Sequence, residues 1–272
     1  MTPVDVHVEV DGPADAPALL FSSSLGSTLA PWEPQVAALR DRFRVIRYDH
    51  RGHGRSPVPP GPYRIEDIAA DALALLDRLG VARTHFCGLS LGGMVGLQLA
   101  ATAPDRIDRL VLCCTSAQLG PPEQWAQRAA AVRAGGTASI AATLVGRWLT
   151  PPFAAANPDL VDGLRAMIAG IPDDGYAACC SAIEHMDLRP LLGQVRAPTL
   201  VIAGSADPAT PPEHAARIVA GVPGARLVVL DGAAHLASIE QPEAVTGLLL
   251  EHLTDPTLPA TAPAATAEGS GD

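Results

Sequence analysis

The sequence predicts an α/β protein in which helices cover both faces of a mostly parallel sheet. Two observations indicate this class. Short, continuously apolar runs recur along the chain, as expected for strands buried on both faces of a parallel sheet. They alternate with segments whose apolar residues follow helical spacing. The length of 272 residues and the apolar content of 48% suit one domain with a large core and an insertion.

The predicted strands follow in chain order. Residues 4–10 alternate apolar and polar side chains, which predicts a strand with one exposed face. The later runs are continuously apolar and predict buried strands; they are Ala18–Phe21, Arg44–Tyr48, His85–Cys87, Leu110–Cys114, Leu200–Ala203 and Leu227–Leu230. In an open parallel sheet, the residues that follow such strands gather along one edge, where ligands bind.

Two helices and an insertion complete the pattern. Residues 65–79 form an apolar stripe at helical spacing that Gly80 ends, and Pro242 begins the last helix. Between about 121 and 190 no strand is predicted, and the Ala-rich sequence indicates a helical cap over the carboxyl edge of the sheet. Residues 255–272 are rich in Pro, Ala, Thr and Gly, so we expect a disordered tail or linker after a folded domain at 1–254.

Composition disfavours several functional classes. The formal net charge is −10 and no basic patch is present, which argues against nucleic-acid binding. The apolar runs are too short to span a membrane, and the first residues lack the pattern of a secretory signal. The five cysteines show no metal-binding spacing, so we expect reduced thiols in a cytoplasmic enzyme.

The segment Gly88-Leu-Ser-Leu-Gly92 carries the first chemical signal. It follows the apolar run that ends at Cys87 and precedes a helical run. This is the G-x-S-x-G pattern in a strand–turn–helix setting, where the sharp turn exposes Ser90 and leaves no room for side chains at 88 and 92. The start of the helix offers backbone N–H groups to a developing oxyanion. An ordinary serine in a Gly-rich turn is the alternative, which this setting disfavours.

A serine hydroxyl needs a positioned base, and two downstream segments supply candidates. Asp207 follows the predicted strand Leu200–Ala203, and His235 follows the predicted strand Leu227–Leu230. Because each lies just past a strand, both side chains can converge with Ser90 at one edge of the sheet. We therefore predict Ser90 as nucleophile, His235 as its base and Asp207 as the acid that orients the base.

Each of these residues also has a structural interpretation. Asp207 could form a turn before the proline that follows it, and His235 could be a solvent-facing loop residue. Asp231 is a competing acid, but it lies too close in sequence to His235 to reach around to Nδ1 easily.

The Gly-rich segment Tyr48–Ser56 is a second stretch in which several potentially functional side chains lie close together in the sequence. Its two histidines, His50 and His53, have a spacing that could suggest a metal, but no further ligands cluster nearby, so we predict no metal site. A tight loop after a strand, pinned by Asp49 and Arg51, is the better interpretation. Such a loop can also border the active site.

The serine turn, the Asp49–Ser56 loop and the Asp207/His235 pair resemble the α/β-hydrolase superfamily along almost the whole chain. A narrower resemblance, to the 3-oxoadipate enol-lactonases of the β-ketoadipate pathway, is carried partly by cap segments, where substrate choice is made. The segments that carry it are Ser24–Gly26, Gly88–Gly96, Gly146–Phe153, Gly175–Ile183, Asp187–Arg189 and Ala233–Pro242. The departure is modest: Ser22-Ser23 stand where an Asn is common in relatives, which affects a side-chain contact and not the mechanism.

The resemblance implies an α/β-hydrolase fold with a mostly parallel eight-stranded sheet and a helical cap. It implies that the backbone N–H of Leu25 acts with that of Leu91 as the oxyanion hole. The substrate would be a small anionic lactone, so a cation is expected under the cap. Our candidate is Arg147 beside Trp148, and Arg128, Arg133 and Arg189 are next in line. An exposed helix arginine and a cap-core tryptophan are the structural alternatives for Arg147 and Trp148. No metal or organic cofactor is implied.

The expected reaction is hydrolysis of 3-oxoadipate enol-lactone to 3-oxoadipate through an acyl-enzyme. A related small-ester hydrolase or cofactor-free perhydrolase with the same triad is the second class. A non-catalytic binding protein of this fold is the third, which an intact Ser90–Asp207–His235 set disfavours. In some bacteria such a lactonase is fused to a decarboxylase domain, and the linker-like tail is compatible with fusion to, or association with, such a domain.

Overall fold

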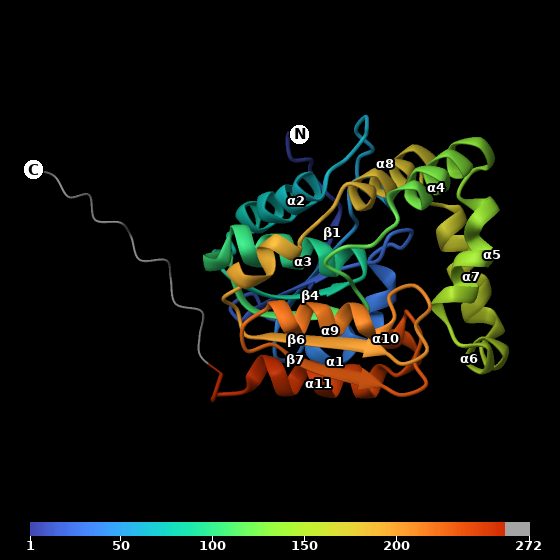
Figure 1. Cartoon of the computed structure of the whole chain (residues 1–272). Helices are drawn as coiled ribbons and strands as arrows, with labels where there is room; N and C mark the ends of the chain where they lie inside the picture. The colour runs from blue at the N-terminus through green and yellow to red at the C-terminus, as the bar shows by residue number, and fades with distance from the viewer. Residues whose placement is uncertain (259–272) are drawn as a thin grey trace, which may run out of the picture.

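A computed structural model describes residues 1–258 of the chain, and its centre is a seven-stranded sheet (Figure 1). The spatial order is β1-β3-β2-β4-β5-β6-β7, with β1 antiparallel to β3 and every other pair parallel. The strands are β1 (Val8–Asp11), β2 (Ala18–Ser22), β3 (Arg44–Tyr48), β4 (Thr84–Leu89), β5 (Ile107–Cys113), β6 (Thr199–Gly204) and β7 (Arg226–Leu230). The predicted α/β class with a mostly parallel sheet is confirmed.

Helices cover both faces of this sheet. In Figure 1, α2 and α3 lie above the sheet with α9, and α1 and α11 lie below it. Their bounds are α1 (Glu33–Leu39), α2 (Ile65–Arg78), α3 (Leu91–Thr102), α9 (Pro212–Gly221), α10 (Ala237–Glu240) and α11 (Pro242–Thr254), with short 3-10 turns at Ala30–Trp32, Pro104–Arg106 and Arg189–Gln194. Residues 91–101 of α3 are all buried, so this helix is enclosed on every side.

Five further helices lie between β5 and β6, where the sequence predicts a cap. They are α4 (Pro122–Gly135), α5 (Ala138–Trp148), α6 (Pro151–Ala156), α7 (Pro158–Ala169) and α8 (Asp173–Glu184). Helix α4 packs against α8, and α5 packs against α7. Figure 1 shows this group beside the ends to which the β6 and β7 arrows point, so it borders the carboxyl edge of the sheet.

The expectation of eight strands is wrong for the described residues. The predicted strand at 4–10 is shorter and shifted, because β1 comprises Val8–Asp11. Upstream of β1, the N–H of Val6 donates to the carbonyl of Val4 at 3.0 Å, and the N–H of Val4 donates to Oδ1 of Asp71 in α2 at 2.8 Å. The first residues are therefore held against α2 and add no strand beside β1.

Two further expectations concern the C-terminal tail and membrane-spanning helices. The predicted tail, 255–272, lies outside the described residues except for its first four. Among residues 1–258, no helix has the length and apolarity that crossing a membrane requires.

Candidate active site

Ser90 sits in the turn that joins β4 to α3. Its φ of 55° and ψ of −114° lie in a region that residues other than glycine rarely adopt. The two flanking glycines make the turn sterically allowed: a Cβ at Gly88 would overlap the carbonyl of Gly92, and a Cβ at Gly92 would overlap the carbonyl of Ser22. The N–H of Ser90 donates to the carbonyl of Cys113 in β5 at 2.9 Å, which fixes the turn against the neighbouring strand.

Asp207 and His235 meet at the carboxyl ends of β6 and β7. Nδ1 of His235 lies 2.8 Å from Oδ2 of Asp207, and both side chains are buried. Asp207 also accepts hydrogen bonds from the N–H of Ala209 at 2.7 Å and from the hydroxyl of Thr210 at 2.7 Å. Asp231, the competing acid, is exposed and accepts a hydrogen bond from the hydroxyl of Ser205 at 3.1 Å.

These contacts set the charge of Asp207. Burial alone would raise its pKa, but the charge of His235 and the hydrogen bonds from His235 and Thr210 outweigh burial and lower the pKa to about 2. Asp207 is therefore a carboxylate at neutral pH. It can hold the proton of His235 on Nδ1, which leaves Nε2 as the basic atom.

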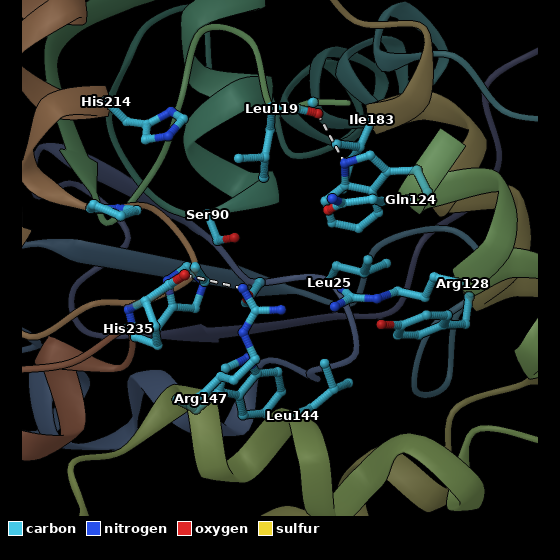
Figure 2. Close-up of a pocket in the computed structure, with 18 residues that line it drawn as sticks. Leu25, Ser90, Leu119, Gln124, Arg128, Leu144, Arg147, Ile183, His214 and His235 are labelled. Carbon is cyan, nitrogen blue, oxygen red and sulfur yellow. Dashed lines mark hydrogen bonds between the residues drawn. The ribbon is translucent and has the colours of Figure 1, made fainter. Parts of the chain in front are cut away.

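Ser90 and His235 line one pocket of about 300 Å³ between the sheet edge and the cap helices (Figure 2). Leu25 lines the same pocket. Within residues 1–258, the backbone N–H groups of Leu25 and Leu91 form no hydrogen bond with the protein. Two free donors close to the serine turn are the arrangement that an oxyanion hole requires.

The predicted cap residues also reach the pocket. Arg147 and Trp148, from the end of α5, both line it, and Nη2 of Arg147 donates to the carbonyl of Pro208 at 3.1 Å. Trp148 is 4% exposed, so it forms both a wall of the pocket and part of the cap core.

Two further side chains line the pocket: Arg128, a second-line candidate from the sequence, and His214, which the sequence did not indicate. Arg128 in α4 lines the pocket, with its guanidinium 4.8 Å from the centroid of the Trp125 ring. His214 in α9 also lines it, and its Nδ1 lies 2.7 Å from the hydroxyl of Ser116. Arg128 stands one helical turn from Trp125, a weak signal in an Ala-rich helix. His214 has no distinguishing pattern in the sequence.

The loop that follows β3 contacts the segment that carries Leu25 but does not line the pocket. Asp49 accepts from the N–H of Leu29 at 2.8 Å and from the N–H of Arg55 at 2.9 Å, while Arg51 forms a buried two-bond ion pair with Asp71 of α2 at 2.5 and 2.6 Å. Both residues thus pin the loop, as the sequence predicts.

The histidines of this loop, His50 and His53, are fully buried. Burial lowers the pKa of His50 to about 4, and burial together with the nearby His50 lowers the pKa of His53 to about 3. Both rings are therefore neutral at physiological pH.

We expect acid to destabilise the protein through these two rings. The unfolded chain binds protons at histidine near pH 6.5, whereas folded His50 and His53 stay neutral to about pH 4 and about pH 3. Because the unfolded state binds more protons in this window, the free energy of unfolding falls as the pH drops from 6.5 to 4. The slope should be about 1.4 kcal/mol per pH unit for each histidine.

Urea unfolding of the wild type and His53→Gln between pH 7 and pH 4 measures this slope, which should be shallower in the variant. The control is His185→Gln, because His185 is exposed. Equal slopes in all three proteins would contradict the expectation.

Comparisons with known proteins agree with this architecture. The family described as "alpha/beta hydrolase fold" matches residues 17–242. The chain is 42% identical over 233 residues to 3-oxoadipate enol-lactonase 2 of Acinetobacter baylyi, covering 86% of this chain and 87% of that protein. It is 38% identical over 238 residues to 3-oxoadipate enol-lactonase 1 of the same organism, covering 88% and 89%.

A solved structure gives the same result. The crystal structure of the enol-lactonase from Burkholderia xenovorans LB400 superposes with a TM-score of 0.91 at 41% identity and covers 93% of this chain and 97% of that chain. The resemblance to enol-lactonases that the sequence motifs indicate is therefore confirmed over nearly the whole described chain. This chain belongs to the α/β-hydrolase family.

Proposed function

We propose that the protein hydrolyses 3-oxoadipate enol-lactone to 3-oxoadipate by nucleophilic catalysis at Ser90. The similarity to enol-lactonases identifies an ester-hydrolysing enzyme, and the choice of this lactone is our inference from those relatives and from the pocket. The observation that carries it is the lining of one pocket of about 300 Å³: a serine in a strained turn, two arginines and the histidine of a buried His–Asp pair.

In the first half of the proposed reaction, Oγ of Ser90 attacks the ring ester carbonyl. Nε2 of His235 takes the serine proton, while Asp207 holds the tautomer and stabilises the imidazolium that forms. The oxyanion receives hydrogen bonds from the N–H groups of Leu25 and Leu91, which would contribute about 3 kcal/mol each. Collapse of the tetrahedral intermediate opens the ring.

The leaving group is an enolate, which departs more readily than an alkoxide. The enolate takes the proton from the imidazolium of His235 and becomes the ketone of the product, which returns His235 to its neutral form. In the second half, water gives a proton to His235 as its oxygen attacks the acyl-serine. His235 then returns this proton to Oγ of Ser90 as the bond to serine breaks and 3-oxoadipate is released. Every proton in this sequence is carried by Ser90, His235, water or the substrate, so the proposal requires no metal and no organic cofactor.

The substrate carboxylate needs a cation, because the net charge of −10 works against binding an anion. Arg147 and Arg128 extend toward the pocket from the two cap helices that carry them (Figure 2). Arg133 is exposed and does not line the pocket, and Arg189 is paired with Asp187 at 2.7 Å, so neither takes this place. We assign the carboxylate to Arg147, with Arg128 as the second contact.

We expect Arg147→Ala to raise KM for the anionic enol-lactone by about tenfold or more, because a guanidinium can hold a carboxylate through two hydrogen bonds. Hydrolysis of a neutral ester of similar size should barely change, because Ser90 and the oxyanion donors are untouched. Steady-state kinetics of both substrates with both proteins measure the difference.

Arg133→Ala is the matched control, because it changes the net charge equally but lies outside the pocket. Equal losses on both substrates would show a general disturbance of the cap. A loss in Arg128→Ala that is absent in Arg147→Ala would move the assignment to Arg128.

The direct test of the function is a spectrophotometric assay of enol-lactone loss with purified protein, with neutral esters as comparison. Preference for the enol-lactone supports the proposal, and preference for neutral esters favours the broader class of small-ester hydrolases. We also propose a cytoplasmic location, since the five cysteines are buried free thiols. A further proposal is fusion to, or association with, a decarboxylase of the same pathway.

A further inference from the structure

The loop between β2 and the first 3-10 turn carries Leu25, whose N–H is free within the described chain. The imidazoles of His50 and His53 form hydrogen bonds with the backbone on either side of this residue. Nε2 of His50 lies 3.0 Å from the carbonyl oxygen of Ser23, and the N–H of Gly26 donates to Nε2 of His53 at 3.0 Å. The Ser23 carbonyl also accepts from the N–H of Gly92 at 3.0 Å, which ties the same loop to the serine turn.

These contacts fix the two rings in opposite tautomers. A carbonyl oxygen can only accept, so His50 carries its proton on Nε2. Gly26 donates, so Nε2 of His53 is unprotonated and its proton is on Nδ1, 3.3 Å from the carbonyl of Arg51. A cationic His53 would present a second proton to the N–H of Gly26 and lose the bond. The neutral state that burial imposes on His53 is therefore the state that its contact with Gly26 needs.

We propose that His50 and His53 are positioning residues for the reaction, which aim the N–H of Leu25 at the oxyanion by holding the peptide groups on both sides of it. The proposal rests on the proposed function at Ser90. Neither ring lines the pocket, so neither touches the substrate. Their effect passes through the backbone, and it concerns the developing oxyanion rather than the bound ester.

Two substitutions at position 53 separate this role from simple packing. In His53→Gln, the side-chain oxygen reaches about as far as Nε2 and can still accept from Gly26. In His53→Asn, the side chain is polar but too short to reach it. We expect His53→Asn to lose about tenfold or more in kcat with KM little changed, and His53→Gln to stay close to wild type.

The effect should be equal on the enol-lactone and on a neutral ester, because an oxyanion forms on both. An alkyl boronic acid, which forms a tetrahedral adduct with the serine, should bind His53→Asn more weakly by the same factor as kcat/KM falls. Competitive inhibition by 3-oxoadipate should change less, because the carbon that Ser90 would attack is a planar carboxylate in the product and not a tetrahedral centre.

His252→Leu is the matched control. His252 is a buried histidine whose Nε2 donates to the carbonyl of Pro198 at 3.1 Å, away from the pocket. It should lower stability without lowering kcat.

Equal losses in His53→Asn and His53→Gln, a change in KM alone, or unchanged boronate affinity would overturn the proposal. These outcomes would not contradict the function proposed for Ser90, because hydrolysis of the neutral ester measures catalysis by this serine whatever the natural substrate is. Failure of the function itself shows as ester hydrolysis that survives the loss of Ser90. If His53→Asn does not fold, His50→Asn takes its place, because it removes the donor to Ser23 in the same way, and unchanged kcat in that variant counts against the proposal.

Discussion

Ser90→Ala is expected to abolish hydrolysis, with kcat reduced by about 10⁴-fold or more, while the protein stays folded. The hydroxyl is the group that would form the acyl-enzyme, and nothing else in the pocket replaces it. The substitution keeps a Cβ at a position that already tolerates one, so the turn geometry should survive. Retention of more than about one part in a hundred of the wild-type kcat would contradict the assignment.

A chemical label provides an independent check of this first prediction. A fluorophosphonate should add to wild-type protein at one site and leave Ser90→Ala unmodified, as mass spectrometry of the intact proteins can measure. Ser139→Ala is the control, because Ser139 is exposed on the cap and should not affect labelling.

Asp207→Asn should lower kcat by about 10³- to 10⁴-fold. An amide at this position can offer its NH₂ group to His235, which favours the wrong tautomer and removes the charge that stabilises the imidazolium. The amide must also satisfy Ala209 and Thr210, which now donate to the carboxylate. Burst and steady-state kinetics on a neutral ester measure the loss without any question of substrate charge.

Asp231→Asn is the control for this second prediction. Asp231 is exposed and bonded to Ser205, so its substitution should leave kcat unchanged. Greater damage from Asp231→Asn than from Asp207→Asn in folded proteins would show that the acid is wrongly assigned.

Much of the sheet could be predicted because most of its inner strands are buried on both faces. The apolar run Leu227–Leu230 is an exception: it forms part of the edge strand β7, which is partly exposed and not buried as predicted. Runs such as Leu200–Ala203 are apolar without interruption, and the structure places β6 there with every residue buried. The placement of Asp207 and His235 just past two parallel strands could also be predicted, since the carboxyl ends of parallel strands share one edge. Their catalytic roles remain predictions, although the structure brings the two side chains to 2.8 Å.

The local pattern predicts seven strands, which is the number in the structure, whereas the expectation of eight came from the family resemblance. What the pattern could not predict is where the first strand begins. Residues 4–7 have the alternation of a strand, but the alternation does not reveal that Asp71, far along the chain, accepts the N–H of Val4. The cap posed a similar difficulty: α4 is Ala-rich with weak amphipathicity, so the face that carries Arg128 toward the pocket depends on how α4 packs against α8. Arg147 reaches the pocket from the last turn of α5. His214 enters the pocket through the placement of α9, which sequence spacing does not encode.

The backbone conformation of Ser90 has a thermodynamic consequence for the whole fold. A residue other than glycine at φ 55° costs about 1–3 kcal/mol, and it persists only where its surroundings determine it fully. The surroundings here are a strand and a helix that are buried throughout, β4 and the first eleven residues of α3. The packing of β4 and α3 thus compensates for the strain at Ser90, and the free energy of unfolding is lower by that amount. At this position, selection for heat resistance therefore opposes selection for turnover.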